Sequence, residues 1–509
     1  MKGKVYLVGA GPGDPGLITL RGLECIRMAD VVVYDYLAAD QLLRHCPEKA
    51  EIIYVGKKGG DHTLSQEKIN QLIADKAEQG LVVTRLKGGD PFIFGRGGEE
   101  AEILAARNIP FEIVPGVTSA IAAPAYAGIP LTHREHTTSV SFITGHEDPA
   151  KEQSTIAWKA LAETGGTLVF LMGVKNLSFI VDRLLEHGRP ADTPAALVRW
   201  GTTAMQQTVT GTLANIVEKV KAAGLQAPCI IIVGGVVALR DTIGWFEATR
   251  PLLGKTIVVT RARAQASDFI AALSQLGAAC IECPTIRVEP PDDFTPLDMA
   301  IDNILTYDWL VFTSVNGVDH FFARLFEKGG DVRRLGHLKT AVIGPATQQR
   351  LLDFGIKSDI VPESFRAESV VESFSRQDVK GKKVLLPRAA EARFVLPEEL
   401  TRMGARVDEV TAYVTKRDDS GARPLLLALE DGKVDMVTFT SSSTVKNFKA
   451  LLPEDKAAVD RLMKTVTVAS IGPITTETAQ KEGFAVHVTA AEYTIEGLVR
   501  AIVDHFSKR

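Results

Sequence analysis

The stretch "VYLVGAGPGDPGLITLRGLECI" at residues 5–26 decides how the start of this chain folds. An apolar run leads into glycines and then into a helix start, which is nearly the order of the dinucleotide-binding fingerprint. In G-x-G-x-x-G terms, Gly9 and Gly11 fit, but Asp14 stands at the third glycine. A carboxylate there would repel a pyrophosphate, and Pro12 removes an N–H donor. The stretch predicts a strand–turn–helix unit with a poor phosphate site.

Three interpretations of this loop are open from the residues alone. Binding of NAD needs an acidic ribose partner about 20 residues further on, which Asp30 or Asp35 would supply. A cofactor without phosphates, such as S-adenosylmethionine, suits a loop that lacks strong anion cradling. A tight turn with no ligand also explains the residues, and it is the favoured interpretation of any single glycine loop.

Two further glycine loops follow apolar runs. "RLKGGDPFIFGRGGEE" at 85–100 places Gly88, Gly89 and Asp90 directly after one run, and "VPGVTSAIAAPAYAGIPLTHRE" at 114–135 adds the third loop. Parallel sheets present their binding sites where strands end. Glycines let the backbone approach a ligand, and Asp90 could accept from a ribose or ammonium group or cap a helix.

The composition bounds the class of protein. At 509 residues the chain should hold several domains, and 45% hydrophobic with 24% charged residues is ordinary for a globular protein. The net charge of −4 gives no sign of nucleic-acid binding, and five scattered cysteines form no disulfide framework, so we expect a cytoplasmic protein. The longest apolar run, "CIIIVGGVVAL", is too short to span a bilayer, and glycines come too early for a secretory signal.

The chain has two parts, and the second part repeats itself. Val- and Ile-rich runs alternate with helical stretches, which predicts an α/β fold of buried parallel sheets covered by helices. "DTIGWFEATRPLLG" at 241–254 interrupts this pattern. Beyond it, equivalent positions recur 127 residues apart: Arg261 and Arg388, Gly277 and Gly404, Phe312 and Phe439. The second part is therefore predicted to be a duplicated α/β unit of two lobes with a cleft between them.

The three glycine loops, with "VVVYDYL", "YVGKKGG", "FLMGV" and "PCIIIVGGVVALR", resemble uroporphyrinogen-III C-methyltransferase, a member of the tetrapyrrole methylases, over about residues 3–245. The resemblance implies a domain at 1–245 with lobes at about 1–115 and 116–245, S-adenosylmethionine between the lobes, and a homodimer through this part. The implied cofactor contacts are Pro12, Gly88, Gly89, Asp90, Ile93, Thr118, Ser119, Met172 and Gly201. The family's usual "TA" is "TS" at 118–119, which keeps a small side chain.

The resemblance also implies catalytic and substrate-binding residues. Asp35 and Lys57 match the family's proposed base and acid, although Asp35 could merely cap a helix and Lys57 merely hold a carboxylate. The implied substrate is a porphyrinogen with eight carboxylates, and its candidate partners are Arg85, Lys87, Arg96, His133, Arg134 and His136. Arg96 and Arg134 are preferred because they lie inside family motifs.

Residues 254–509 resemble uroporphyrinogen-III synthase, after a linker at 246–253. The motifs "FTSVNGV", "VIGPAT", "FTSSSTV" and "IGPIT" are loose, and the duplication and the neighbouring methyltransferase strengthen the resemblance. It implies one discontinuous lobe, at 254–288 plus 416–509, and a second lobe at 289–415. The bare repeat would instead suggest a cut near 381. "CIECPTIRVEP" and "VDEVTAYVTKR" are expected to be the two strands that cross between lobes.

This second resemblance implies closure of hydroxymethylbilane with inversion of its last ring. Tyr413 is the candidate to protonate the leaving hydroxyl, and Arg261, Arg388 and Arg393 are candidates to bind acetate and propionate groups. Hydroxyls at loop ends are further candidates for substrate binding, and each could instead be a helix N-cap: Ser314, Thr347, Thr440, Ser441 and Thr475.

The predicted function is a bifunctional enzyme that makes precorrin-2 from hydroxymethylbilane. Cys280 and Cys283 have no second pair, and His133 and His136 lack further ligands, so no catalytic metal is expected. Open alternatives are a methyltransferase joined to a non-catalytic ligand-binding or regulatory module, a methyltransferase acting on a later precorrin, and one acting on RNA, against which the lack of a basic stripe argues. Whether the product serves sirohaem or cobalamin synthesis stays open.

Overall fold

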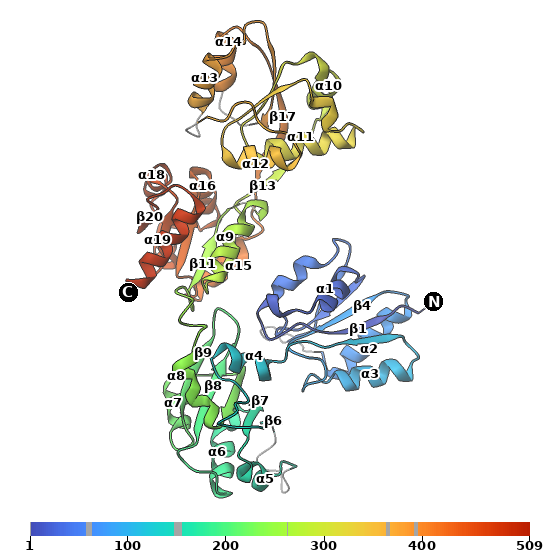
Figure 1. Ribbon diagram of the computed structural model, residues 1–509, viewed down its shortest axis with the longest axis vertical. Helices are drawn as coiled ribbons and strands as arrows, with labels where there is room; N and C mark the ends of the chain where they lie inside the picture. The colour runs from blue at the N-terminus through green and yellow to red at the C-terminus, as the bar shows by residue number, and fades with distance from the viewer. Residues whose placement is uncertain are drawn as a thin grey trace. The chain divides into compact units, whose positions relative to one another are not determined.

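The computed structural model of this chain describes residues 2–56, 64–146, 155–261, 263–362, 367–390 and 395–508. The chain divides into two compact units, one of Met1–Ile257, Ala271–Cys280 and Ile502–Arg509, the other of Val258–Ile270 and Ile281–Ala501. Strands and helices alternate throughout, and the described strands form four five-stranded sheets (Figure 1). The predicted α/β class is confirmed.

The first sheet has the order β3-β2-β4-β1-β5, and its neighbouring strands are parallel. Its strands are β1 (Val5–Gly9), β2 (Val31–Tyr34), β3 (Glu51–Tyr54), β4 (Val83–Lys87) and β5 (Phe111–Val114). Its helices are η1 (Pro15–Leu17), α1 (Leu20–Arg27), η2 (Asp40–His45), α2 (Gln66–Glu78) and α3 (Gly97–Ala106). The chain leaves β1 toward one edge and β4 toward the other, so the switch point lies between these two strands. Open α/β sheets bind ligands at the carboxyl ends of strands at such a point.

Helices cover both faces of the first sheet because alternate residues of each strand point to opposite sides. Val5 and Leu7 of β1 pack with residues of α2 and α3, whereas Tyr6 and Val8 pack with residues of α1 and η2. Figure 1 shows the same arrangement, with α1 on one side of the strands and α2 and α3 on the other.

The second sheet is mixed, with the order β6-β7-β10-β8-β9. Only β6 and β7 pair in parallel, while β10 is antiparallel to β7 and β8, and β8 is antiparallel to β9. The expectation of parallel sheets throughout is wrong here, because β8 and β9 are joined by the short Trp200–Gln206 segment and a parallel connection needs about a dozen residues or more. The elements are α4 (Ser119–Tyr126), β6 (Val140–Thr144), α5 (Trp158–Glu163), β7 (Thr167–Leu171), η3 (Val174–Asn176), α6 (Leu177–Glu186), β8 (Pro194–Arg199), β9 (Gln207–Thr212), α7 (Ile216–Ala222), β10 (Cys229–Val233), η4 (Gly235–Leu239) and α8 (Arg240–Ile243).

The third and fourth sheets have the orders β12-β11-β18-β19-β20 and β13-β17-β16-β14-β15. The third contains β11 (Thr256–Val259), β12 (Ala279–Glu282), β18 (Met436–Phe439), β19 (Thr467–Ser470) and β20 (Val488–Thr489), with helices α9 (Arg263–Gln275), α15 (Ala422–Glu430), α16 (Ser442–Leu451), α17 (Lys456–Met463), α18 (Pro473–Lys481) and α19 (Ile495–Ser507). The fourth contains β13 (Ile286–Glu289), β14 (Trp309–Phe312), β15 (Lys339–Val342), β16 (Lys383–Ala389) and β17 (Arg406–Arg417), with α10 (Thr295–Asp302), η5 (Ile304–Thr306), α11 (Val315–Glu327), η6 (Val332–Leu335), α12 (Pro345–Asp353), α13 (Ala367–Ser375) and α14 (Val395–Arg402).

These two sheets repeat each other in a permuted chain order. The neighbours β12-β11-β18-β19 of the third sheet correspond to β17-β16-β14-β15 of the fourth. In the fourth sheet β14 and β15 precede their partners along the chain, so strands on both sides of residue 381 share one sheet. The segments expected to cross contain β13 and β17, which pair antiparallel. The numerical limits of the lobes and of the linker at 246–253 stay predictions.

Among the described residues, no helix combines the length and the apolar character that crossing a membrane requires.

Candidate functional site

Three glycine loops meet at the carboxyl ends of β1, β4 and β5. A Cβ added to Gly9 would lie 2.5 Å from the Cα of Gly116, and one added to Gly116 would lie 2.4 Å from the carbonyl oxygen of Gly89. The backbones of Gly11 and Gly89 exchange hydrogen bonds, with N···O distances of 3.2 and 2.7 Å. Only glycine permits this approach, so the switch point of the first sheet is built from bare backbone.

Asp90 ties two of these loops together. Its Oδ1 accepts from the N–H groups of Phe92 and Ile93 at 2.7 and 3.0 Å, and its Oδ2 accepts from Gly116 N at 2.9 Å. The carboxylate therefore closes its own turn and anchors the loop after β5. Asp90 does not cap a helix, since α3 begins at Gly97 with Arg96 as its N-cap, and its role in binding a ligand stays a prediction.

The opening loop joins the two lobes of the first unit. Asp14 accepts from the Tyr126 hydroxyl at 2.8 Å, and its N–H donates to Thr202 Oγ1 at 3.0 Å. A Cβ on Gly13, whose φ is +144°, would lie 2.5 Å from Thr203 Cγ2. Burial and the bond to Asp14 raise the pKa of Tyr126 to about 12. The loop residue that departs from the dinucleotide fingerprint thus makes a structural contact between lobes.

Most of the predicted cofactor residues come together around these loops. Gly89 lies beside Thr118 and Ser119, since its added Cβ would be 3.7 Å from Thr118 Cα and from Ser119 N. Thr118 is buried and caps α4 through Ala120 N. Gly201 lies beside Gly13, the residue that follows Pro12. A Cβ added to Gly13 would be 3.6 Å from the carbonyl oxygen of Gly201.

The remaining predicted cofactor residues differ in how they are placed. Gly88 packs on Leu37, whose Cβ is 2.4 Å from the added Cβ position. Ile93 and Met172 are 38% and 51% exposed. Met172 directly follows β7.

The same loops contain non-glycine residues with positive φ, a strained backbone conformation that their residue types do not predict. In the part of the chain that the structure describes, the non-glycine residues with positive φ are Phe94, Arg96, Asn108, Met172, Trp200 and Thr202. All except Asn108 lie in segments that carry predicted site residues or directly flank them. Such conformations cost about 1–3 kcal/mol each and persist where the surrounding structure imposes them.

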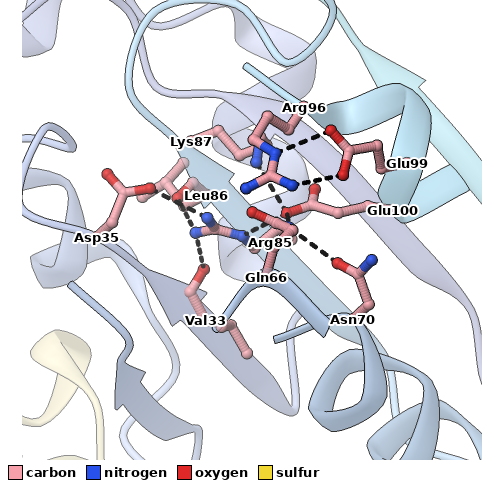
Figure 2. A network of polar contacts seen from close by, with 10 residues as sticks. All are labelled: Val33, Asp35, Gln66, Asn70, Arg85, Leu86, Lys87, Arg96, Glu99 and Glu100. Atoms are coloured by element: carbon pink, nitrogen blue, oxygen red, sulfur yellow. Dashed lines mark hydrogen bonds and ion pairs between the residues drawn. The ribbon is translucent and has the colours of Figure 1, made fainter. Parts of the chain in front are cut away.

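A buried charge cluster lies beneath Asp35 (Figure 2). Arg85 donates to Asp35 Oδ2 at 3.0 Å and to Glu100 Oε1 at 3.2 Å, and Lys87 donates to Glu100 Oε1 at 2.8 Å. The side chains of Arg85, Lys87 and Glu100 are 3%, 4% and 1% exposed, against 25% for Asp35. Burial and the neighbouring Arg85 charge lower the pKa of Lys87.

This cluster corrects part of the prediction for substrate binding. Arg85 and Lys87 cannot take carboxylates from a substrate while they are buried and paired inside the protein. Arg96 and Arg134 are exposed, and Arg96 pairs with Glu99 at 2.6 Å on the surface of α3. Lys57, the predicted acid, lies outside the described residues.

In the second unit, Tyr413 on β17 meets Ser314 at the end of β14. Their hydroxyl oxygens are 3.0 Å apart, and Tyr413 is 8% exposed. Ser314 also caps α11 by accepting from Gly317 N at 3.0 Å. The His320 ring stacks on Tyr413 with centroids 5.6 Å apart, and burial lowers the pKa of His320. The sequence motifs did not point to His320.

The other predicted hydroxyls of the second unit lie at or near helix starts, and the described arginines lie on or directly after strands. Ser441 caps α16 in a capping box with Thr444, matching Ser314 in the repeat. Thr347 and Thr475 are buried in the first turns of α12 and α18, and Thr440 is half-buried after β18. Arg388 is buried and pairs with Glu409 at 2.9 Å, while burial lowers the pKa of Arg261. Arg393 lies outside the described residues.

Among the residues that the structure describes, no group of three or more His, Cys, Asp or Glu side chains is placed to hold a metal ion. Neither Cys280 nor Cys283 forms a disulfide with another described residue, and burial raises the pKa of Cys283 to about 12.

Two family models match the chain. Residues 4–217 match the tetrapyrrole (corrin/porphyrin) methylases, and residues 267–500 match uroporphyrinogen-III synthase HemD. The porphyrin biosynthesis protein HemD of Ruminiclostridium josui is 39% identical over 99% of this chain and 98% of its own length. An S-adenosyl-L-methionine-dependent uroporphyrinogen III methyltransferase of Methanosarcina barkeri is 55% identical over 48% of this chain and 95% of its own length.

A solved structure of uroporphyrin-III C-methyltransferase from Thermus thermophilus, complexed with S-adenosyl homocysteine, is 38% identical, covers 47% of this chain and 100% of that chain, and has a TM-score of 0.40. The family assignment rests on the sequence matches. The chain belongs to the tetrapyrrole methylase family in its first part and to the uroporphyrinogen-III synthase family in its second.

Proposed function

We propose that this chain cyclises hydroxymethylbilane to uroporphyrinogen III and then methylates that product twice on carbon to give precorrin-2. The observation that carries the methyltransferase activity is the convergence of the bare backbone of Gly9, Gly89 and Gly116 at the switch point of the first sheet. The match to the uroporphyrinogen-III synthase family and the contact between Tyr413 and Ser314 support the synthase activity.

The loops of the first unit fit S-adenosylmethionine better than a dinucleotide. Pro12 offers no N–H to a phosphate, and Asp14 adds a negative charge where a pyrophosphate would lie in the dinucleotide fold. The residues that would hold the cofactor are Pro12, Gly88, Gly89, Asp90, Ile93, Thr118, Ser119, Met172 and Gly201. The bound cofactor would supply a methyl group already activated by its sulfonium.

The side chains of the first unit would align the substrate and remove a proton. Positioning a pyrrole carbon in line with the methyl group lowers the barrier chiefly through entropy. The methylated ring is cationic and must lose a proton, for which Asp35 is the proposed base and Lys57 the proposed acid elsewhere in the cycle. Arg96 and Arg134 are exposed and would bind carboxylates, with Arg96 leaving Glu99 to do so.

In the second unit Tyr413 would donate its hydroxyl proton to the departing hydroxyl of hydroxymethylbilane, which leaves as water. The phenolate formed would accept a hydrogen bond from Ser314 Oγ, 3.0 Å away. Arg261, Arg388, Thr347, Thr440, Ser441 and Thr475 would bind the acetate and propionate groups and hold the chain for closure with inversion. Arg388 would have to exchange Glu409 for a substrate carboxylate.

The proposal extends to location and assembly. A cytoplasmic location is consistent with cysteines that form no disulfide among the described residues, and a homodimer through the first unit follows from the family resemblance. Light scattering at micromolar concentration should give twice the chain mass of 55.0 kDa. A monomer would contradict the homodimer.

One assay tests the whole proposal. The purified chain is given hydroxymethylbilane and isotopically methyl-labelled S-adenosylmethionine, and products are separated by isomer and by methyl content. We expect the type III skeleton carrying two labelled methyl groups. If the chain gives type I product but methylates supplied uroporphyrinogen III, the proposed synthase activity is wrong. If it gives type III product without label, the proposed methyltransferase activity is wrong.

A further inference from the structure

Arg85 makes contacts that neither family motif explains. It lies on β4 with its side chain 3% exposed, and its guanidinium donates to the carbonyl oxygens of Val33 and Leu86 at 3.4 and 3.1 Å. The remaining donors reach Glu100 and Asp35, as Figure 2 shows. The guanidinium therefore spans the strand ends and connects a buried acid to the proposed base.

Both oxygens of Asp35 are held by neighbouring groups. Oδ1 accepts from Leu37 N at 3.1 Å, and Oδ2 accepts from Arg85 at 3.0 Å. These two bonds restrict the orientation of the carboxylate, while a quarter of the side chain remains exposed. An orientation fixed from behind leaves the outward lone pairs free to accept a proton.

Arg85 is itself held by a second layer of charge. Glu100 Oε1 accepts from Arg85, from Lys87 at 2.8 Å and from Gln66 at 3.1 Å. The cluster of Asp35, Arg85, Lys87 and Glu100 contains two basic and two acidic groups. A buried charge costs several kcal/mol unless it is paired, so each ionic contact keeps its neighbours in place.

We propose that Arg85 is a positioning residue that orients Asp35 for proton removal during methyl transfer, and that Glu100 and Lys87 hold Arg85 in place. This inference rests on the proposed methyltransferase function and on Asp35 as its base. The guanidinium acts through Asp35 and does not touch the substrate.

A double-mutant cycle tests the inference. Turnover of supplied uroporphyrinogen III is measured for the wild type, Asp35→Asn, Arg85→Gln and the double variant, with S-adenosylhomocysteine affinity measured by calorimetry. Arg85→Gln should lower kcat by about 10- to 100-fold, as expected for a lost hydrogen bond to a charged group, with KM and cofactor affinity nearly unchanged. The double variant should be no slower than Asp35→Asn.

Two further variants separate positioning from stability. Arg85→Lys keeps the buried positive charge, so the variant should fold. A lysine cannot hydrogen-bond to two acids in the geometry of a guanidinium, so kcat should still fall nearly as far as in Arg85→Gln. Arg189→Gln is the matched control, since Arg189 is also buried and donates to the carbonyl oxygen of Gly166 at 3.2 Å in the other lobe. It should lower the melting temperature and leave kcat unchanged.

The outcomes distinguish the inference from the function beneath it. Multiplicative losses in the double variant, or a raised KM at unchanged kcat, would overturn the positioning role while leaving the methyltransferase intact. An unchanged turnover in Asp35→Asn would show that Asp35 is not the base, and the proposed role of Arg85 would then be wrong as well. A wild-type chain that transfers no methyl group would instead remove the proposed function itself.

Discussion

The proposed base of the first unit and the proposed acid of the second are held by different kinds of contact. Asp35 is an acidic group that pairs with a buried arginine, which in turn pairs with a buried glutamate. Tyr413 is a neutral phenol that hydrogen-bonds to the hydroxyl of a helix-capping serine. A charge near the interior requires a countercharge, whereas a neutral hydroxyl needs only one polar partner. The difference predicts that the first unit depends on a cluster and the second on single side chains.

The loops around the two groups differ in the same way. In the first unit, glycines bring three backbones within van der Waals contact. In the second unit, Ser314 and Ser441 satisfy the N-termini of equivalent helices. Substitutions that add a Cβ should therefore damage the first unit most, and substitutions that remove a hydroxyl should damage the second.

The largest expected effect separates the two activities. Tyr413→Phe removes a proton donor, which typically slows the assisted step by about 10²–10⁴-fold. Unassisted hydroxymethylbilane closes without inversion, so isomer analysis should find type I product, while methylation of supplied uroporphyrinogen III continues at the wild-type rate. Asp35→Asn should give the reverse pattern. Full type III formation by Tyr413→Phe would take Tyr413 out of the mechanism, and loss of both activities would indicate misfolding.

A smaller effect is expected from filling the glycine contact. Gly116→Ala places a Cβ 2.4 Å from the Gly89 oxygen and forces the loops apart. Overpacking typically costs about 1–3 kcal/mol, and a loss of that size from binding corresponds to about 5- to 140-fold weaker S-adenosylhomocysteine affinity by calorimetry. Gly98→Ala is the control, because nothing lies within 4 Å of its added Cβ. Equal affinities for the two variants would contradict a cofactor site at this contact.

Ser314→Ala should slow type III formation by about tenfold, the value of one modest hydrogen bond. The variant also loses a helix cap, which costs about 1 kcal/mol of stability. Asp455→Ala loses the cap of α17, where Asp455 accepts from Ala457 N and Ala458 N, and serves as the matched control. If both variants slow ring closure equally at matched folded fractions, the Ser314 effect is one of stability alone.

The smallest expected effect concerns the joint between the lobes of the first unit. Tyr126→Phe removes the bond to Asp14 and should lower the free energy of unfolding by about 1 kcal/mol at pH 8. The folded protein holds the Tyr126 proton more tightly than the unfolded chain, since its pKa is raised to about 12. This contribution is fully present below about pH 10 and is lost as the pH rises toward 12. The difference between wild type and variant in denaturant titrations should shrink over that interval; a constant difference would argue against the bond.

Several features of this protein could be determined from the sequence alone. The alternation of apolar runs and helices predicts an α/β chain, and the repeat at Phe312 and Phe439 predicts two equivalent sheets. Pro12 and Asp14 do not fit the dinucleotide-binding fingerprint, and they indicate that the opening loop is not a dinucleotide site. These conclusions depend on local properties that can be read from the residues themselves: hydrophobic periodicity, the positions of glycines, and the backbone N–H that Pro12 lacks.

Other features were decided only by the tertiary structure. The antiparallel pairing of β10 with β7 and β8 depends on contacts between segments that are separated along the chain. The same holds for Arg85, which has the residue type of a surface carboxylate binder but is buried between Asp35 and Glu100. An arginine on a strand can face solvent or an internal acid, and nothing in its neighbours along the chain distinguishes the two. Burial and charge pairing are properties of three-dimensional neighbours, so they appear only when β2, β4 and α3 are brought together.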